Sequence, residues 1–428
     1  EIFPETAPGN FTFDETMQKW VMTVFNNYQW DLNYSNPAVF IEMLDIILFW
    51  ANRGADIVRL DAVAFLWKKI GTTSQNEREA HLILQLFKDC CQVTAPGVLF
   101  IAEAIVAPVE IIKYFGEDAV IAKECEIAYN ATFMALLWDA LATRNAKLLN
   151  QGISSLPVKL DRATWLNYAR CHDDIGLGFD DNDIRAVGYD PAAHRRFLID
   201  YYTGAYADST ARGKPFGRNA KTGDARISGS LASLVGLETA LERGDEAEVQ
   251  RSIDQVLLLH SLIMSFGGIP LIYYGDELGT LNNEDFLKDA EKARDSRWIH
   301  RPRYDWDRAE LRHQRGSVEQ RIFDGLKQMI AVRKSTAALA DHNNRELIDV
   351  GNPHLFVFTR SNPAVTLDSV LVIANFNDEP ERLDLTDLRN RGRFELGDLH
   401  DIVSGAAPTR FGDEVVIPAY GFYWLKCS

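Results

Sequence analysis

Ala55-Asp-Ile-Val-Arg-Leu60 and Val98-Leu-Phe-Ile-Ala102 are the two stretches that decide the fold class of this chain. Both are short and rich in β-branched or aromatic residues, which favours strands. A helical pattern precedes each strand: one begins at Pro37 behind the capping pair Ser35-Asn36, and another covers residues 77–93. Strands that alternate with helices predict βαβ units, so we expect an α/β protein with a parallel sheet.

The rest of the chain extends this pattern and then changes it. Three further buried-type strands are expected at residues 126–129, 165–169 and 271–274. The period becomes two from about residue 343, which predicts a small antiparallel β domain. We therefore expect five parts: an irregular segment 1–36, parallel strands and helices over 37–174, an inserted subdomain 175–254, a last strand and helix over 255–342, and the β domain 343–428.

Composition narrows the class of protein. The chain has 428 residues, of which 46% are hydrophobic and 25% charged, and its formal charge is −16. This balance is typical of a folded soluble protein and excludes whole-chain disorder. The acidity argues against nucleic-acid binding, and no apolar run approaches the roughly 20 residues of a membrane span. We expect no membrane contact and no cofactor.

The five cysteines give the expected compartment. Their number is odd, two are adjacent and none has metal-ligand spacing, so we expect free thiols, no metal site and a cytoplasmic location. They are Cys90, Cys91, Cys125, Cys171 and Cys427. The chain begins at Glu1, without Met or a targeting pattern.

Three acidic residues stand at the ends of predicted parallel strands: Asp61, Glu103 and Asp173. Chemistry in α/β sheets and barrels is placed at that edge. Neighbouring strands lie about 4.8 Å apart, so Asp61 and Glu103 are expected roughly 5 Å apart, the separation of a retaining glycosidase. Arg59, two residues before Asp61, shares its face and favours an ionised nucleophile. The apolar strand before Glu103 favours a raised pKa and general-acid work.

A structural interpretation competes with this one. A single acidic residue after a strand is usually a helix cap or a solvated loop group, and a histidine such as His172 is more often structural than catalytic. Three carboxylates at successive strand ends, with Arg59 and His172 beside them, favour function.

These segments resemble the α-amylase family (glycoside hydrolase family 13). The resemblance rests on Ala55-Asp-Ile-Val-Arg-Leu-Asp-Ala62, Phe100-Ile-Ala-Glu-Ala104 and Cys171-His-Asp-Asp174, with Gly267-Gly-Ile-Pro-Leu-Ile-Tyr-Tyr-Gly-Asp-Glu277 similar to the eighth barrel strand. Within the family, residues 25–37, 223–229 and 296–304 are most similar to the sucrose-cleaving amylosucrase group. The resemblance implies strands four to eight of a (β/α)8 TIM barrel, an inserted subdomain and a C-terminal antiparallel β-sandwich.

The resemblance also implies residue roles. Asp61 would be the nucleophile, Glu103 the general acid/base, and Asp173 the carboxylate that stabilises the transition state. The other implied residues would bind sugar: Phe25, Arg59 and His172 in the glucosyl subsite, Asp174, Arg195 and Arg226 at the fructosyl or acceptor side, and Arg297 at the pocket floor, paired with an acidic residue from a segment that this sequence lacks. For any one of these arginines, a surface salt bridge is the competing interpretation.

Two positions depart from the amylosucrase pattern, both on the acceptor side. Leu177 replaces the usual Trp, and Gly217-Arg218 replaces the Gln-Tyr that follows the Phe. We therefore expect glucosyl transfer mainly to water, a sucrose hydrolase. The alternatives are an amylosucrase that extends α-1,4-glucan and a non-catalytic carbohydrate-binding relative. The first three barrel strands have no counterpart here, so the expected partner is a preceding segment of the same protein, without which we expect poor stability or no activity.

Overall fold

The computed structural model describes residues 11–116, 123–157, 160, 162–340, 344–362, 369–386, 388 and 399–427. The chain divides into two compact units. The first comprises residues 1–129, 157–165 and 217–222, and the second comprises residues 130–156, 166–216 and 223–428.

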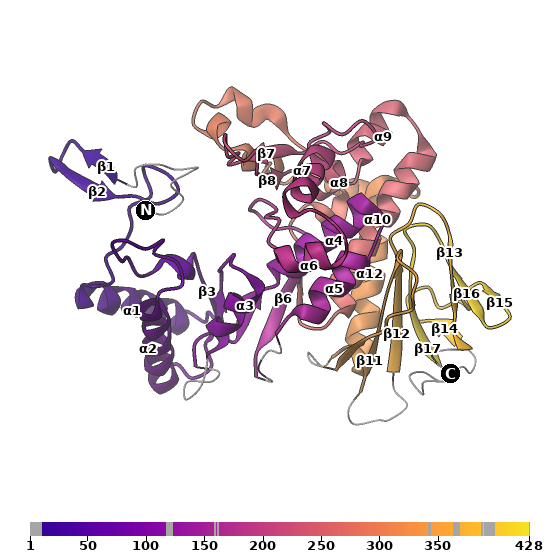
Figure 1. The fold of residues 1–428 in the computed structure, drawn as a ribbon, viewed down its shortest axis with the longest axis horizontal. Helices are drawn as coiled ribbons and strands as arrows, with labels where there is room; N and C mark the ends of the chain where they lie inside the picture. Colours follow the sequence, from indigo (N-terminus) through magenta and orange to yellow (C-terminus); the bar gives the residue numbers. More distant parts are fainter. Residues whose placement is uncertain are drawn as a thin grey trace. The chain divides into compact units, whose positions relative to one another are not determined.

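The first unit contains the two stretches that predicted the fold. The helix α1 (Pro37–Asn52) begins as expected, with Asn36 accepting a hydrogen bond from the Ala38 N–H. It leads to β3 (Ile57–Leu60), and α2 (Arg78–Thr94) leads to β4 (Leu99–Ala102). Strand β4 pairs in parallel with both β3 and β5 (Ile127–Tyr129). The predicted βαβ arrangement is therefore confirmed (Figure 1).

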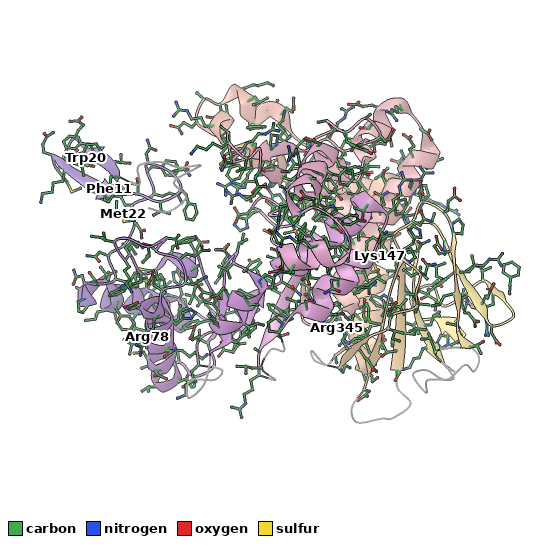
Figure 2. All side chains as sticks on the ribbon, in the orientation of Figure 1. Phe11, Trp20, Met22, Arg78, Lys147 and Arg345 are labelled. Atoms are coloured by element: carbon green, nitrogen blue, oxygen red, sulfur yellow. The ribbon has the colours of Figure 1, made fainter. Side chains whose placement is uncertain are left out.

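The beginning of the chain differs from the expectation of irregular structure. Strands β1 (Phe11–Asp14) and β2 (Lys19–Met22) form an antiparallel hairpin, whereas residues 1–10 lie outside the described part. Phe11 and Phe13 alternate with polar residues in β1, but Val21 separates Trp20 from Met22 in β2, so only the first strand has a period-two pattern. Phe11 and Trp20 are exposed side chains on this hairpin (Figure 2).

A cluster of buried apolar side chains forms a core in the first unit. It includes Val63, Leu84, Phe87 and Phe100, with Phe40 of α1 stacked on Phe87 at 4.5 Å. Among the described strands, β3 pairs only with β4, and Ile57 on β3 is 45% exposed. The expectation of a partner segment beyond β3 remains a prediction.

The second unit continues the parallel strands. β6 (Thr164–Tyr168) begins in the first unit and ends in the second, where it pairs in parallel with β9 (Ile269–Leu271). The last strand was expected over residues 271–274 and lies earlier, because Gly267 and Gly268, both at positive φ, turn the chain into Ile269. The helices α10 (Glu246–Ser265) and α12 (Val318–Ser335) lie side by side (Figure 1).

The residues expected to form an inserted subdomain make helices and one hairpin. The hairpin pairs β7 (Lys214–Phe216) with β8 (Arg226–Ser228). The remaining helices of the unit are α4 (Ala131–Thr143), α5 (Lys147–Ser155), α6 (Asp181–Ala186), α7 (Pro191–Tyr202), α8 (Leu231–Leu234), α9 (Leu237–Arg243) and α11 (Trp306–Glu310); the first unit also holds α3 (Pro108–Ile111).

The C-terminal residues form the antiparallel β structure that the period-two pattern predicts. One sheet has the order β10-β11-β12-β17-β14 and the other β13-β16-β15. Arg345 of β10 lies 3.6 Å from the ring centre of Phe266 and donates to the Phe266 carbonyl. The strands are β10 (Arg345–Leu347), β11 (Leu355–Ser361), β12 (Ser369–Asn375), β13 (Glu381–Asp384), β14 (Leu399–Asp401), β15 (Arg410–Phe411), β16 (Glu414–Ile417) and β17 (Phe422–Cys427).

The structure bears on the expectations of free thiols and of no membrane-spanning helix. Cys90, Cys91, Cys125 and Cys171 are free thiols. No helix in the described part of the chain has both the length and the apolar character needed to cross a membrane.

Candidate active site

The carboxyl ends of β3 and β4 bring Asp61 and Glu103 together in the first unit. Leu60 is in register with Ala102, so the two acidic residues follow paired positions. The Ala62 N–H, directly after Asp61, donates to Glu103 Oε2 at 2.9 Å. Ala62 has a left-handed backbone (φ 49°), which turns the chain sharply at the strand end. Asp61 keeps 73% of its side chain exposed and accessible.

Arg59 is the residue that holds Asp61 in place. Its Nη1 donates to Asp61 Oδ1 at 2.5 Å, and its Nε donates to the Tyr129 hydroxyl at 3.1 Å. Burial disfavours the guanidinium cation, but the hydrogen bond to Asp61 and the nearby negative charges outweigh burial, so the pKa of Arg59 is raised. The expected neighbourhood of Arg59 and Asp61 is therefore present. Phe25 lies in the same unit, with its ring edge-to-face against Phe65 at 6.1 Å.

Asp173 is the centre of a polar cluster in the second unit. Its Oδ1 accepts from Arg297 Nη1 at 2.9 Å and from Arg301 Nη2 at 3.0 Å, and its Oδ2 lies 3.1 Å from His172 Nε2. Arg297 pairs with Asp173 and Asp295. All three residues belong to the second unit. The expected pairing of Arg297 with an acidic residue from a segment outside this sequence stays a prediction.

His300 supports this cluster from behind. The Gly229 N–H donates to its Nδ1 at 3.1 Å, so its Nε2 carries the proton and donates to the His172 carbonyl at 3.1 Å. Burial is the main cause that lowers the pKa of His300 to about 2, and the positive charge of Arg170 contributes to the same shift. Sequence reasoning missed His300 and Arg301. Both lie in the segment 296–304 that carried the resemblance, which was the available signal.

A buried ion pair anchors the strand that leads to this cluster. Arg170 Nε donates to Asp276 Oδ1 at 3.1 Å, and Arg170 Nη1 donates to the Cys171 carbonyl. Burial raises the pKa of Asp276 to about 6 against the opposing effect of Arg170. The pair fixes the backbone immediately before His172 and Asp173.

Asp174 and Arg226 form the neighbouring contact. Arg226 Nε lies 3.3 Å from Asp174 Oδ2, and burial raises the pKa of Asp174, although Arg226 and Arg297 oppose the rise. The ring of Phe216 lies below the guanidinium groups of Arg226 (4.8 Å) and Arg297 (4.5 Å). Cation–π contact of this kind holds both arginines beside the carboxylates.

Arg195 contacts the loop that follows Asp174 in the second unit. It donates to the Phe179 carbonyl at 2.8 Å and to Asp181 Oδ1 at 2.6 Å. These bonds fix the loop that follows Asp174, and Leu177 on that loop is buried.

A possible metal-ligand group overlaps this cluster. Ligand atoms of Cys171, His172 and Asp173 lie within 4.8 Å of one another. Burial raises the pKa of the Cys171 thiol to about 12, which disfavours the thiolate that metals require, and two arginines already occupy Asp173. The chemistry of this group therefore does not suit a cation.

One family model matches the first part of the chain. Residues 2–174 match the family model "Alpha amylase, catalytic domain". This match supports the alpha-amylase family. It covers Asp61, Glu103 and Asp173, and it ends at Asp174.

Individual proteins similar to this chain carry the names of different enzymes. The chain is 26% identical to trehalose synthase/amylase TreS of Mycobacterium tuberculosis (strain ATCC 25618 / H37Rv) over 451 residues, covering 100% of this chain and 68% of that protein. It is 29% identical to glucosylglycerate phosphorylase of Spirochaeta thermophila over 362 residues, covering 83% of this chain and 56% of the relative.

Solved structures show the same fold. Sucrose 6F-phosphate phosphorylase from Thermoanaerobacter thermosaccharolyticum superposes with a TM-score of 0.64 and 18% identity, over 86% of this chain and 66% of that one. The alpha-amylase from H.orenii gives 0.60 and 14% identity, over 98% and 70%. This chain thus spans about two thirds of these structures.

Proposed function

We propose that this chain is the larger part of a retaining enzyme that cleaves the glucosidic bond of sucrose and transfers the glucosyl unit mainly to water. The observation that carries the proposal is the pairing of β3 with β4. It places Asp61 and Glu103 at adjacent strand ends, with Glu103 Oε2 bonded to the N–H of the residue after Asp61. Paired strands about 4.8 Å apart suit the roughly 5 Å between carboxyl groups that covalent, retaining catalysis needs.

The residue roles in this proposal follow the sequence prediction. Asp61 attacks the anomeric carbon of the glucosyl unit while Glu103 protonates the fructosyl oxygen, so that fructose leaves and a glucosyl ester remains on Asp61. Glu103 then takes a proton from water, and water releases glucose. Arg59 supports the first step because its hydrogen bond to Asp61 Oδ1 holds the attacking carboxylate in position. Asp173 would stabilise positive charge at the anomeric carbon.

The sugar-binding roles proposed for the remaining residues use polar and planar groups. Phe25, Arg59 and His172 are proposed for the glucosyl unit, and Arg297 is proposed to hold Asp173 in place. Asp174, Arg195 and Arg226 are proposed for the fructosyl unit or an acceptor. The buried Asp174 carboxylate has an Oδ2 atom without a hydrogen bond of good geometry, which suits a ligand hydroxyl.

Phosphorolysis is a second candidate reaction. Arg226, Arg297 and Arg301 gather at Asp173 and Asp174, and guanidinium groups are suited to oxyanions. Two of the similar proteins are named phosphorylases. In that case phosphate, instead of water, would take the glucosyl unit from Asp61.

One experiment tests these proposals together. The full-length protein is incubated with sucrose, with and without inorganic phosphate, and the sugars are separated. Glucose and fructose in equal amounts support hydrolysis; insoluble glucan supports the amylosucrase alternative; glucose 1-phosphate supports phosphorolysis. The Glu103→Gln variant should accumulate a glucosyl ester on the peptide that contains Asp61, detected by mass. Turnover of trehalose but not sucrose would refute the proposed substrate, and no adduct and no turnover would support a non-catalytic relative.

A further inference from the structure

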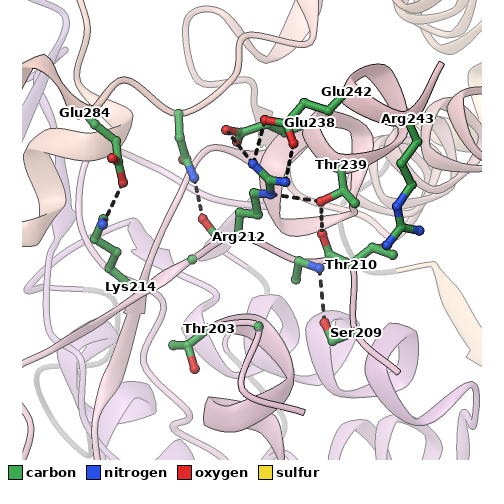
Figure 3. Close-up of a pocket in the computed structure, with 14 residues that line it drawn as sticks. Thr203, Ser209, Thr210, Arg212, Lys214, Glu238, Thr239, Glu242, Arg243 and Glu284 are labelled. Carbon is green, nitrogen blue, oxygen red and sulfur yellow. Dashed lines mark hydrogen bonds and ion pairs between the residues drawn. The ribbon is translucent and has the colours of Figure 1, made fainter. Parts of the chain in front are cut away.

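A pocket of about 650 Å³ lies in the second unit, lined by residues other than those of the candidate active site (Figure 3). Its wall comes from three parts of the chain: the end of α7 with the loop that leads into β7, the helix α9, and the loop after β9 that carries Asn282 and Glu284. The volume falls in the range of small-molecule sites. None of the residues proposed for sucrose chemistry lines it.

The pocket is built around two sets of paired charges. Arg212 donates through both terminal nitrogens to the two carboxylate oxygens of Glu242, and its Nε donates to Thr239 Oγ1 at 3.0 Å (Figure 3). Glu238 stands 3.7 Å from Arg212. On another wall, Lys214 Nζ lies 2.7 Å from Glu284. Donors and acceptors therefore alternate along the pocket.

These pairs remain open to solvent. The side chains of Arg212, Lys214 and Glu242 are 40%, 36% and 54% exposed. Asn282 fixes the loop that carries Arg212, since its amide donates to the Arg212 carbonyl and its Oδ1 accepts from Ser230 N–H at 2.8 Å. The charged groups are thus held in position and accessible to a ligand.

The charges of the residues that line the pocket limit the class of ligand. Three basic residues, Arg212, Lys214 and Arg243, oppose three acidic ones, Glu238, Glu242 and Glu284. This zero net charge disfavours phosphates and other polyanions. The residues that line the pocket include no aromatic ring and few apolar side chains, which disfavours a hydrophobic ligand.

A neutral molecule with adjacent hydroxyl groups matches such a wall. Each hydroxyl is both a donor and an acceptor, so one diol satisfies a carboxylate and a guanidinium that stand side by side. Hydrogen bonds to charged partners are also the stronger kind. We propose that this pocket binds a short neutral saccharide, through diol contacts to the Arg212–Glu242 and Lys214–Glu284 pairs.

Strand β7 carries both a residue of the pocket and a residue in contact with the Asp173 cluster. Lys214 and Phe216 are alternate residues of β7, so they share a face and lie about 7 Å apart along the strand. Phe216 supports Arg226 and Arg297 from below. A saccharide at Lys214 therefore lies two residues along β7 from the ring that contacts the arginines of the Asp173 cluster. The binding itself does not depend on the proposed sucrose chemistry.

Hydrogen exchange with mass spectrometry tests the site directly. The probe is maltose, added to the full-length Glu103→Gln variant so that turnover does not consume it, with sorbitol and inorganic phosphate as comparison ligands. Maltose at about ten times its dissociation constant should slow exchange several-fold in peptides covering residues 203–214 and 237–243. Because no aromatic ring stacks on the sugar, we expect a dissociation constant on the order of 1 mM.

Two substitutions separate the pocket from other sugar sites. Glu242→Gln and Glu284→Gln, each added to the same background, should weaken the protection of residues 203–214 at least five-fold. The control is Glu414→Gln, which breaks a similar exposed pair with Arg382 in the C-terminal sheets and should change nothing. Using two pocket variants keeps the test valid if one folds poorly.

The outcomes distinguish this proposal from the proposed function. Protection by maltose only around residues 172–179, or unchanged protection in both pocket variants, would overturn the pocket proposal, as would stronger protection by phosphate than by maltose. Protection of residues 203–214 together with no sucrose turnover by the wild type would uphold the pocket and refute the proposed function.

Discussion

Replacing His300 with glutamine or asparagine should make the stability of this protein less sensitive to acid. His300 is buried and neutral, with a pKa lowered to about 2, whereas an unfolded histidine has a pKa of about 6.5. The unfolded chain therefore binds a proton that the folded chain does not bind between these values. Stability from this group is fully present above pH 6.5 and is lost as pH falls towards 2.

The expected magnitude follows from these two pKa values. Each pH unit within the window costs about 1.4 kcal/mol, so lowering the pH from 7.5 to 5.0 should remove about 2 kcal/mol of unfolding free energy through His300. Asp276 has the opposite sign, since its pKa is raised to about 6 and its protonation favours the folded state. His260, whose pKa is lowered to about 4 by burial, has the same sign as His300. Asp276 and His260 are present in the wild type and in every variant, so their contributions cancel when the unfolding free energies of variant and wild type are subtracted.

Urea unfolding of the full-length wild type and variants at pH 7.5 and 5.0 measures this difference. Glutamine keeps a donor near the Nε2 position and asparagine keeps an acceptor near Nδ1, so each variant leaves one buried partner unsatisfied. Each should cost about 1–3 kcal/mol at pH 7.5, and this deficit should shrink by about 2 kcal/mol at pH 5.0.

The control is His313→Gln, at an exposed histidine, which should show a change within about 0.5 kcal/mol at both pH values. A deficit in the His300 variants that is equal at the two pH values would refute the reasoning. Asparagine lacks the donor to the His172 carbonyl, so it should lower kcat more than glutamine does if that bond positions Asp173.

Three further predictions follow from local contacts. In the Arg59→Lys variant, lysine cannot bond both Asp61 and Tyr129, so kcat for sucrose should fall on the order of 100-fold. The control is Arg53→Lys, which should leave kcat unchanged because Arg53 lies over the exposed ring of Phe49. Asn36→Ala removes the cap of α1 and should cost about 1 kcal/mol of unfolding free energy, with Asn36→Asp restoring most of it; equal losses in both would contradict the capping role. Phe358 is fully buried, so Phe358→Ala should cost about 3–5 kcal/mol of unfolding free energy, measured by calorimetry. The same measurement on Phe411→Ala, whose ring is 60% exposed, should show little change.

The local elements of this protein were readable from sequence because their causes are local. Asn36 and Pro37 set the start of α1, and the short β-branched run before Asp61 made β3, since capping and strand preference act within a few residues. The period-two C-terminal strands were likewise predicted. The hairpin β1–β2 was missed because β2 has no apolar–polar alternation, since Val21 lies between Trp20 and Met22.

The sequence by itself determined the residue types at the candidate site: the carboxylates Asp61, Glu103 and Asp173, and the basic residues near them. Only the tertiary structure decided their partners. Arg301 and His300 meet the Cys171–Asp173 stretch from almost 130 positions away, and Ala62 bonds Glu103 across 41 positions. Such contacts are set by packing between distant segments, and no local preference specifies them.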